Sequence, residues 1–148
     1  MTNTDTTTHA TDTNGSTTNG TGSGATPDGA LTAIVDRALS AYCDPDAMRR
    51  AATIAEIWEA DGELLDPPLA GRGHAELAAL TDAVLAHFPD HIFRRTSVVD
   101  SHHGRGRYQW ELVGPSGAAG LAGTDFVEVA DSGRIRRIVG FFGPLTDA

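Results

Sequence analysis

The spacing of apolar residues changes once along this chain, at Pro89, and that change limits the folds available to it. Before Pro89, apolar residues recur every three or four positions, which is typical of amphipathic helices. After Pro89, apolar and polar residues alternate in segments separated by turn-forming residues, which is typical of strands. Helices followed by a strand meander predict an α+β domain, in which a curved sheet packs one face against the helices.

The first half of the pattern predicts three helices and one short strand. Capping residues and prolines mark where each helix ends, because a proline cannot continue a helix and an aspartate can satisfy its first backbone amides. The predicted helices run from residue 31 to the pair Asp44 and Pro45, from that pair through Trp58 to residues 61–62, and from residue 77 to 88, with a strand at 63–66.

The second half predicts four strands joined by short turns. The strands cover residues 91–101, 107–113, 119–130 and 134–142, and the turns lie at 103–106, 114–117 and 131–133. Each turn is rich in glycine and other residues that adopt turn conformations easily. Strands joined by such short links are expected to be antiparallel neighbours.

Residues 1–29 differ in composition from the rest of the chain. They contain eleven threonines and five glycines but no aromatic residue and no Leu, Ile or Val. Such a segment buries too little apolar surface to offset the entropy of ordering its backbone. We therefore expect a disordered leader at 1–29 and one folded domain at 30–148.

Charge and cysteine content exclude several classes of protein. The net charge is −9 and every one of the 11 basic residues is arginine, so the basic stripe that nucleic acid requires is missing. The arginine pairs at 49/50, 94/95 and 136/137 are interpreted as solvated faces. The single cysteine, Cys43, allows no internal disulfide and favours a cytoplasmic location. No apolar run approaches the roughly 20 residues of a membrane span.

The order of elements, together with several short motifs, resembles the NTF2-like superfamily, and within it the SnoaL-like proteins. The motifs are Leu65-Asp66-Pro67, Gly71-Arg72-Gly73, Gly123-Thr124-Asp125-Phe126 and the closing segment 133–143. The resemblance implies a cone-shaped half-barrel, with three N-terminal helices packed on a curved, mostly antiparallel sheet. It also implies a homodimer that pairs through the outer faces of its sheets, where Phe126 would lie.

Two aspartates are the candidate catalytic residues. In the ketosteroid isomerases of this superfamily, the strand that matches residues 63–66 ends in the same Asp-Pro pair, and that aspartate is the general base. Asp66 also lies beside apolar residues, and the partial desolvation expected there would raise its pKa toward that of a proton shuttle. The alternative is a structural role, because Asp before Pro is a common turn device.

Asp125 is expected to face the interior, because strand alternation places it on the same side as Val127 and Val129. The resemblance matches it to the protonated aspartate that donates a hydrogen bond to the enolate in ketosteroid isomerases. The alternative is an ordinary Asp bonded to an arginine or a backbone amide. Two positions depart from the family patterns: Ala38 replaces the isomerase tyrosine, for which Tyr42 is a possible substitute, and Gly140 replaces the acid of the cyclases.

Aromatic residues are expected to line a pocket for a small hydrophobic ligand. They are Tyr42, Trp58, Phe88, Tyr108, Trp110 and Phe142. We expect no metal, because His102 and His103, as neighbours on a strand, would point to opposite faces. We also expect no cofactor.

Two functional hypotheses follow from these residues and the resemblance. The first is a cofactor-independent enzyme that transfers protons on a steroid-like or polyketide-like carbonyl compound, as an isomerase or cyclase; epoxide hydrolases and dehydratases also occur on this fold. The second is a non-catalytic binding or dimerisation module. A cavity that reaches Asp66 would favour the first, and a pocket filled by aromatic side chains would favour the second.

Overall fold

The computed structural model describes residues 27–144. The predicted leader lies outside the described residues except at its end, where the first helix has already begun. The elements in chain order are α1 (Pro27–Tyr42), α2 (Ala47–Ile57), β1 (Trp58–Asp66), β2 (Leu69–Arg72), α3 (Gly73–His87), β3 (Ile92–Arg95), β4 (Asp100–His102), β5 (Arg105–Val113), β6 (Ala119–Val129) and β7 (Ile135–Phe142).

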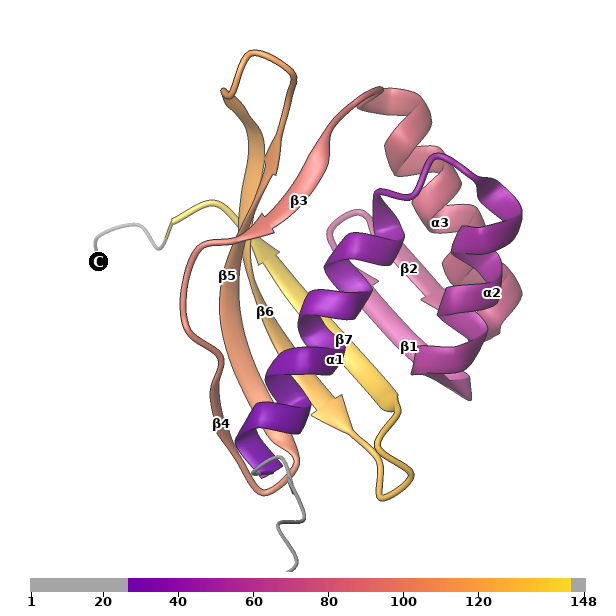
Figure 1. Cartoon of the computed structure of the whole chain (residues 1–148), viewed down its shortest axis with the longest axis vertical. Helices are drawn as coiled ribbons and strands as arrows, with labels where there is room; N and C mark the ends of the chain where they lie inside the picture. The colour runs from indigo at the N-terminus through magenta and orange to yellow at the C-terminus, as the bar shows by residue number, and fades with distance from the viewer. Residues whose placement is uncertain (1–26, 145–148) are drawn as a thin grey trace, which may run out of the picture.

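The strands form one seven-stranded mixed sheet. Its order is β2-β1-β7-β6-β5-β3, and β4 also pairs with β5. All pairs are antiparallel except β1 with β7, which run parallel. Figure 1 shows α1 lying across the curved sheet, with α2 and α3 beside β1 and β2. The predicted α+β fold is confirmed, with the difference that α3 follows two strands, so the helices are not all N-terminal.

The core lies between the helices and the sheet. The side chains of Val35, Ile54, Trp58, Leu112 and Ile138 have no exposed surface. They come from both halves of the chain, so the helical stripes and the inward-facing strand residues bury one another, as the two periodicities predict. None of the helices within 27–144 is long and apolar enough to cross a membrane.

The boundary between α2 and β1 differs from the prediction. Trp58 was expected in the helix, but it begins β1, where it pairs with Ile135 of β7. Trp58 is also at helical spacing from Ile54, so periodicity alone could not tell a buried helix residue from a buried strand residue. The strand β2, which pairs with β1 at Asp66↔Leu69, was not predicted either. Similarly, the predicted strand 91–101 is divided into β3 and β4.

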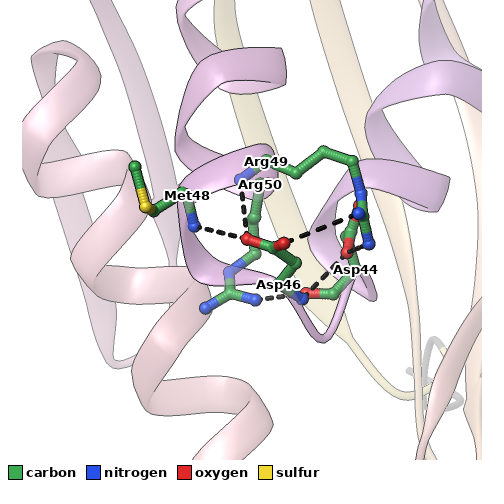
Figure 2. Close-up of polar contacts among 5 residues, drawn as sticks. All are labelled: Asp44, Asp46, Met48, Arg49 and Arg50. Carbon is green, nitrogen blue, oxygen red and sulfur yellow. Dashed lines mark hydrogen bonds and ion pairs between the residues drawn. The ribbon is translucent and has the colours of Figure 1, made fainter.

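The N-terminus of α2 begins at a different cap from the predicted one (Figure 2). The carboxylate of Asp46, not Asp44, accepts the backbone amides of Met48 and Arg49, at 3.0 and 3.1 Å. Asp44 instead accepts the backbone amide of Asp46 at 2.9 Å. Asp44 therefore fixes the backbone of the cap residue, and Asp46 satisfies the free backbone amides in the first turn of the helix.

Arg50 corrects the prediction that the arginine pairs are solvated. Only 5% of Arg50 is exposed. Its guanidinium donates to the backbone carbonyl of Asp44 and to Oδ1 of Asp82 on α3, the latter from Nε at 3.1 Å. Its neighbour Arg49 is exposed and pairs with Asp44 (Figure 2). Arg50 thus ties the loop before α2 to α3.

We expect Arg50→Met to lower the free energy of unfolding by about 2 kcal/mol, because a buried carbonyl and a partly buried ion pair lose their donor. The matched variant Arg49→Met should cause a much smaller loss, because its ion pair is exposed to solvent. Urea denaturation of both variants measures the difference. Equal losses would show that Arg50 does not connect these elements.

The outer face of the sheet carries exposed aromatic residues, as predicted for Phe126. Phe126 and Phe141 are 47% and 56% exposed, and their rings meet edge to face with centroids 6.1 Å apart. The homodimer expected to cover this face stays a prediction.

Candidate functional site

A cavity lies between the helices and the concave face of the sheet. Its walls come from α1, α3, β1, β3, β5 and β6 and the start of β2. The centre of a water-sized molecule can occupy about 50 Å³ of this cavity. The lining residues are Leu39, Tyr42, Leu64, Asp66, Leu69, Leu77, Leu80, Thr81, Val84, Phe93, Trp110 and Asp125. Both predicted aspartates therefore reach one largely apolar cavity.

Asp66 occupies the last position of β1. Alternation places it on the same side of the strand as Leu64, while Leu65 between them is exposed on the outer face. Its Oδ1 atom is buried and has no hydrogen-bond partner among the described residues. A buried carboxyl oxygen without a donor disfavours the charged form.

The pKa of Asp66 follows from this environment. Burial, and next the nearby carboxylate of Asp125, raise the pKa of Asp66 to about 7, and a backbone hydrogen bond with Gly140 opposes the shift. A carboxyl group with a pKa near 7 exists in both protonation states at neutral pH. It can therefore take up a proton and release it in one reaction cycle.

Asp125 lies on the inner face of β6 and is 6% exposed, which confirms its predicted orientation. Its two oxygens accept hydrogen bonds from β5: Tyr108 Oη donates to Oδ2 at 2.8 Å and Trp110 Nε1 donates to Oδ1 at 2.7 Å. Burial raises the pKa of Asp125, while these two donors lower it. The predicted alternative was an Asp bonded to an arginine or a backbone amide. The partners of Asp125 are instead the side chains of a tyrosine and a tryptophan.

Gly140 allows the two carboxyl groups to approach each other. It pairs with Asp125 across β6 and β7, and it follows Val139, the partner of Leu65 on β1. A Cβ atom on Gly140 would lie 1.8 Å from Oδ1 of Asp66 and 2.9 Å from Oδ1 of Asp125. The carboxyl group of Asp66 thus occupies the space that a side chain at position 140 would need, so an acid at 140 is incompatible with Asp66 in this position.

Tyr42, at the end of α1, brings the third polar group into the cavity. Its hydroxyl oxygen accepts a hydrogen bond from Nε1 of Trp58 at 3.0 Å, and its ring packs edge to face against Phe93. Ala38, one turn earlier on the helix, is fully buried. Because an alanine has no hydroxyl group, position 38 lacks the hydroxyl of the isomerase pattern. Tyr42 provides a hydroxyl group one turn further along the helix.

Of the predicted pocket residues, Tyr42 and Trp110 line the cavity. The other four do not line the cavity but contact residues near it. Trp58 forms a hydrogen bond with Tyr42, and Tyr108 forms one with Asp125. Phe142 packs on Trp110 with ring centroids 5.9 Å apart, and Phe88 packs against the core. The prediction missed the wall contributed by α3, namely Leu77, Leu80, Thr81 and Val84. Their three- and four-residue spacing was visible in the sequence, but it indicated only an apolar helix face.

The histidine pair differs from its prediction. Nδ1 of His102 and Nδ1 of His103 are 3.2 Å apart, so the two rings do not point to opposite faces. The reason is that β4 ends at His102, and His103 has a positive φ of 50° in the following turn. Within residues 27–144, no three His, Cys, Asp or Glu side chains gather as ligands for a metal ion.

Solved structures place the chain among known proteins. A proposed isomerase of the SnoaL-like family from Agrobacterium tumefaciens is 30% identical, with a TM-score of 0.74 over 78% of this chain and 98% of that one. The chain belongs to the SnoaL-like family. No protein-family model and no curated protein sequence matches it.

More distant structures share the SnoaL-like fold. A proposed SnoaL-like polyketide cyclase from Jannaschia is 16% identical, with a TM-score of 0.64 over 82% of this chain and 91% of that one. A proposed ketosteroid isomerase from Kribbella flavida is 17% identical, with a TM-score of 0.58 over 80% of this chain and 82% of that one. At these identities the likeness concerns the fold alone.

Proposed function

We propose that this SnoaL-like protein is a cofactor-independent enzyme that moves a proton within a small, largely apolar carbonyl compound, and that Asp66 is its general base. One observation carries the proposal: Asp66 lines an apolar cavity, and its buried Oδ1 atom has no hydrogen-bond partner among the described residues. Structural aspartates in protein interiors are normally hydrogen-bonded. A carboxyl group that lines a cavity and keeps one oxygen without a partner is expected where a substrate completes its interactions.

The reaction needs only the groups already present. The carboxylate of Asp66 takes a proton from the carbon next to the carbonyl, so that the C–H bond breaks and its electron pair forms the enolate. Asp66, now protonated, returns the proton to a different carbon of the conjugated system. The double bond moves, no electrons leave the substrate, and no cofactor is required. Isomerisation is thus the reaction class that we favour over cyclisation.

The single cysteine supports placing this activity in the cytoplasm.

Asp125 is proposed as the second acid of the site. Its carboxyl group lies next to that of Asp66 at Gly140 and raises the pKa of Asp66 when it is charged. When protonated by burial, it would donate a hydrogen bond toward the substrate oxygen.

The alternative, a non-catalytic binding module, required a pocket closed by aromatic side chains. The apolar cavity that Asp66 and Asp125 both line supports the enzyme instead.

The test uses two apolar bicyclic ketones as probes. In D₂O, trans-2-decalone should exchange its α-protons faster with the protein than in buffer, and a β,γ-unsaturated octalone should be converted to its conjugated isomer. The value of kcat/KM should rise with pH and become constant above about 7, because the base must be ionised. Exchange at the buffer rate with both probes, or a profile that is flat through pH 7, would contradict the proposal.

A further inference from the structure

The turn between β4 and β5 brings two histidine rings together. His103 and Gly104 are the central residues of this hairpin turn, and both have a positive φ, 50° and 71°. The left-handed backbone at His103 interrupts the strand alternation, so its ring lies beside that of His102, the last residue of β4. Nδ1 of His102 and Nδ1 of His103 are 3.2 Å apart. The two nitrogens therefore face each other.

A hydrogen bond between the rings does not by itself require this arrangement. In neutral imidazoles one Nδ1 must donate and the other must accept, so the pair shares one proton. Both rings are exposed, and water would satisfy each nitrogen equally well. Asparagine or glycine would also fit the left-handed position with less strain. The distinctive property of the pair is that two Nδ1 lone pairs converge on one point once the shared proton leaves.

The separation of the two nitrogens matches a shared metal ion. With metal–nitrogen bonds of about 2.1 Å, the 3.2 Å distance gives an angle of about 100° at the metal between the two nitrogens. This angle lies between the roughly 90° of a tetragonal site and the roughly 109° of a tetrahedral one. An ion can therefore bind both nitrogens without a large movement of either ring.

The surroundings of the pair leave room for the rest of a coordination sphere. The rings border a surface cleft beside the start of α1, where the centre of a water-sized molecule can occupy about 130 Å³ (Figure 1). This space is enough for several water ligands. The guanidinium of Arg105 approaches the backbone carbonyl of His103 at 3.4 Å, but it also pairs with Glu128 at 3.2 Å, which offsets its charge.

We propose that Nδ1 of His102 and Nδ1 of His103 together bind one divalent transition-metal ion, with water completing its coordination. Affinity for an imidazole site generally rises from Mn²⁺ to Cu²⁺ and falls again at Zn²⁺, so Cu²⁺ should bind most tightly. The ground for expecting no metal was that the two rings would point to opposite faces, and the structure removes that ground. The inference is independent of the proposed function, because the pair borders a different cleft from the cavity that Asp66 lines.

Titration of the full chain with Cu²⁺, followed by calorimetry, tests the site. His102→Gln and His103→Asn should each weaken the binding of one ion at least about tenfold, since even an outer-shell partner of a metal ligand typically contributes 10- to 100-fold. Asparagine adopts a positive φ readily, so the second variant keeps the turn. The matched control is His87→Gln, which removes another exposed histidine, at the end of α3, and should bind Cu²⁺ like the parent.

The double variant measures how well isolated imidazoles bind the ion. The chain has six histidines, so a protein with both changes keeps four of them. A parent affinity no higher than that of the double variant would overturn the proposal. A loss confined to one of the two single variants would also overturn it, because a single histidine would then bind the ion alone.

Nitrogen NMR of the parent protein, labelled with ¹⁵N-histidine, locates the ion on the rings. Without metal, one of the two rings must carry its proton on Nδ1 to form the contact. With saturating Zn²⁺, which is diamagnetic, both rings should carry the proton on Nε2, because both Nδ1 atoms bind the ion. A proton that stays on Nδ1 in either ring, or a change of signal in only one ring, would show that the two nitrogens do not share a metal.

Discussion

Asp66→Asn should lower kcat for octalone isomerisation by at least about 10³-fold and leave KM within a few-fold of the parent. An amide has nearly the shape of a carboxyl group but cannot accept a proton, so the variant loses the base while the cavity stays intact. General base catalysis typically contributes 10² to 10⁴ in rate, and here the same group also returns the proton. Steady-state assays at pH 8, where Asp66 of the parent is ionised, measure the loss.

The matched control is Asp61→Asn on the same strand. Asp61 is exposed and pairs with Arg72 at 3.4 Å, away from the cavity. It should retain the kcat of the parent. The assignment of Asp66 as the base would be wrong if Asp66→Asn kept full turnover, or if both variants lost activity equally.

Asp66→Asn should also make the protein more stable at neutral and higher pH, by an amount on the order of 3 kcal/mol. The folded state raises the pKa of Asp66 to about 7, whereas an unfolded aspartate titrates near pH 4. Between these values the folded state binds more protons than the unfolded state. The contribution of Asp66 to stability therefore falls as pH rises from about 4 to about 7, and it is constant above that range.

This prediction is measured as a difference between two proteins. The amide introduced by Asp66→Asn does not titrate, so the gap in unfolding free energy between variant and parent should be small near pH 4.5 and should widen up to pH 8. The groups that face Asp66 are Asp125 and Tyr42, and both are present in the two proteins. Chemical denaturation at several pH values checks the result. A gap that does not change with pH would mean that Asp66 titrates normally in the folded state.

The two predictions for Asp66→Asn differ in direction, because activity should fall while stability should rise. A residue that costs stability when ionised and yet lies in an apolar cavity is expected where function, not folding, requires it. If Asp66→Asn proves both more stable and inactive, the desolvated carboxyl is a functional feature. If it is more stable but fully active, the burial of Asp66 has a different cause.

The local pattern of the sequence was sufficient for the order of the elements. Three-and-four spacing and strand alternation depend only on which residues are apolar, and they predicted the helices and the antiparallel meander from β5 to β7. The same alternation placed Asp125 on the inner face of β6. It did not predict the parallel pairing of β1 with β7 or the transition from helix to strand at Trp58, because both depend on contacts with residues more than seventy positions away.

The sequence by itself determined which groups capable of chemistry the chain possesses, namely Asp66, Asp125 and Tyr42, and its resemblance to known proteins pointed to the two aspartates. Only the tertiary structure decided how these groups meet. The pairing of β1, β7 and β6 brings the two carboxyl groups together over Gly140, where a side chain would exclude them. The contact of Trp58 with Tyr42 then orients the hydroxyl. Desolvation and hydrogen-bond geometry arise from packing between distant segments, and no local pattern encodes them.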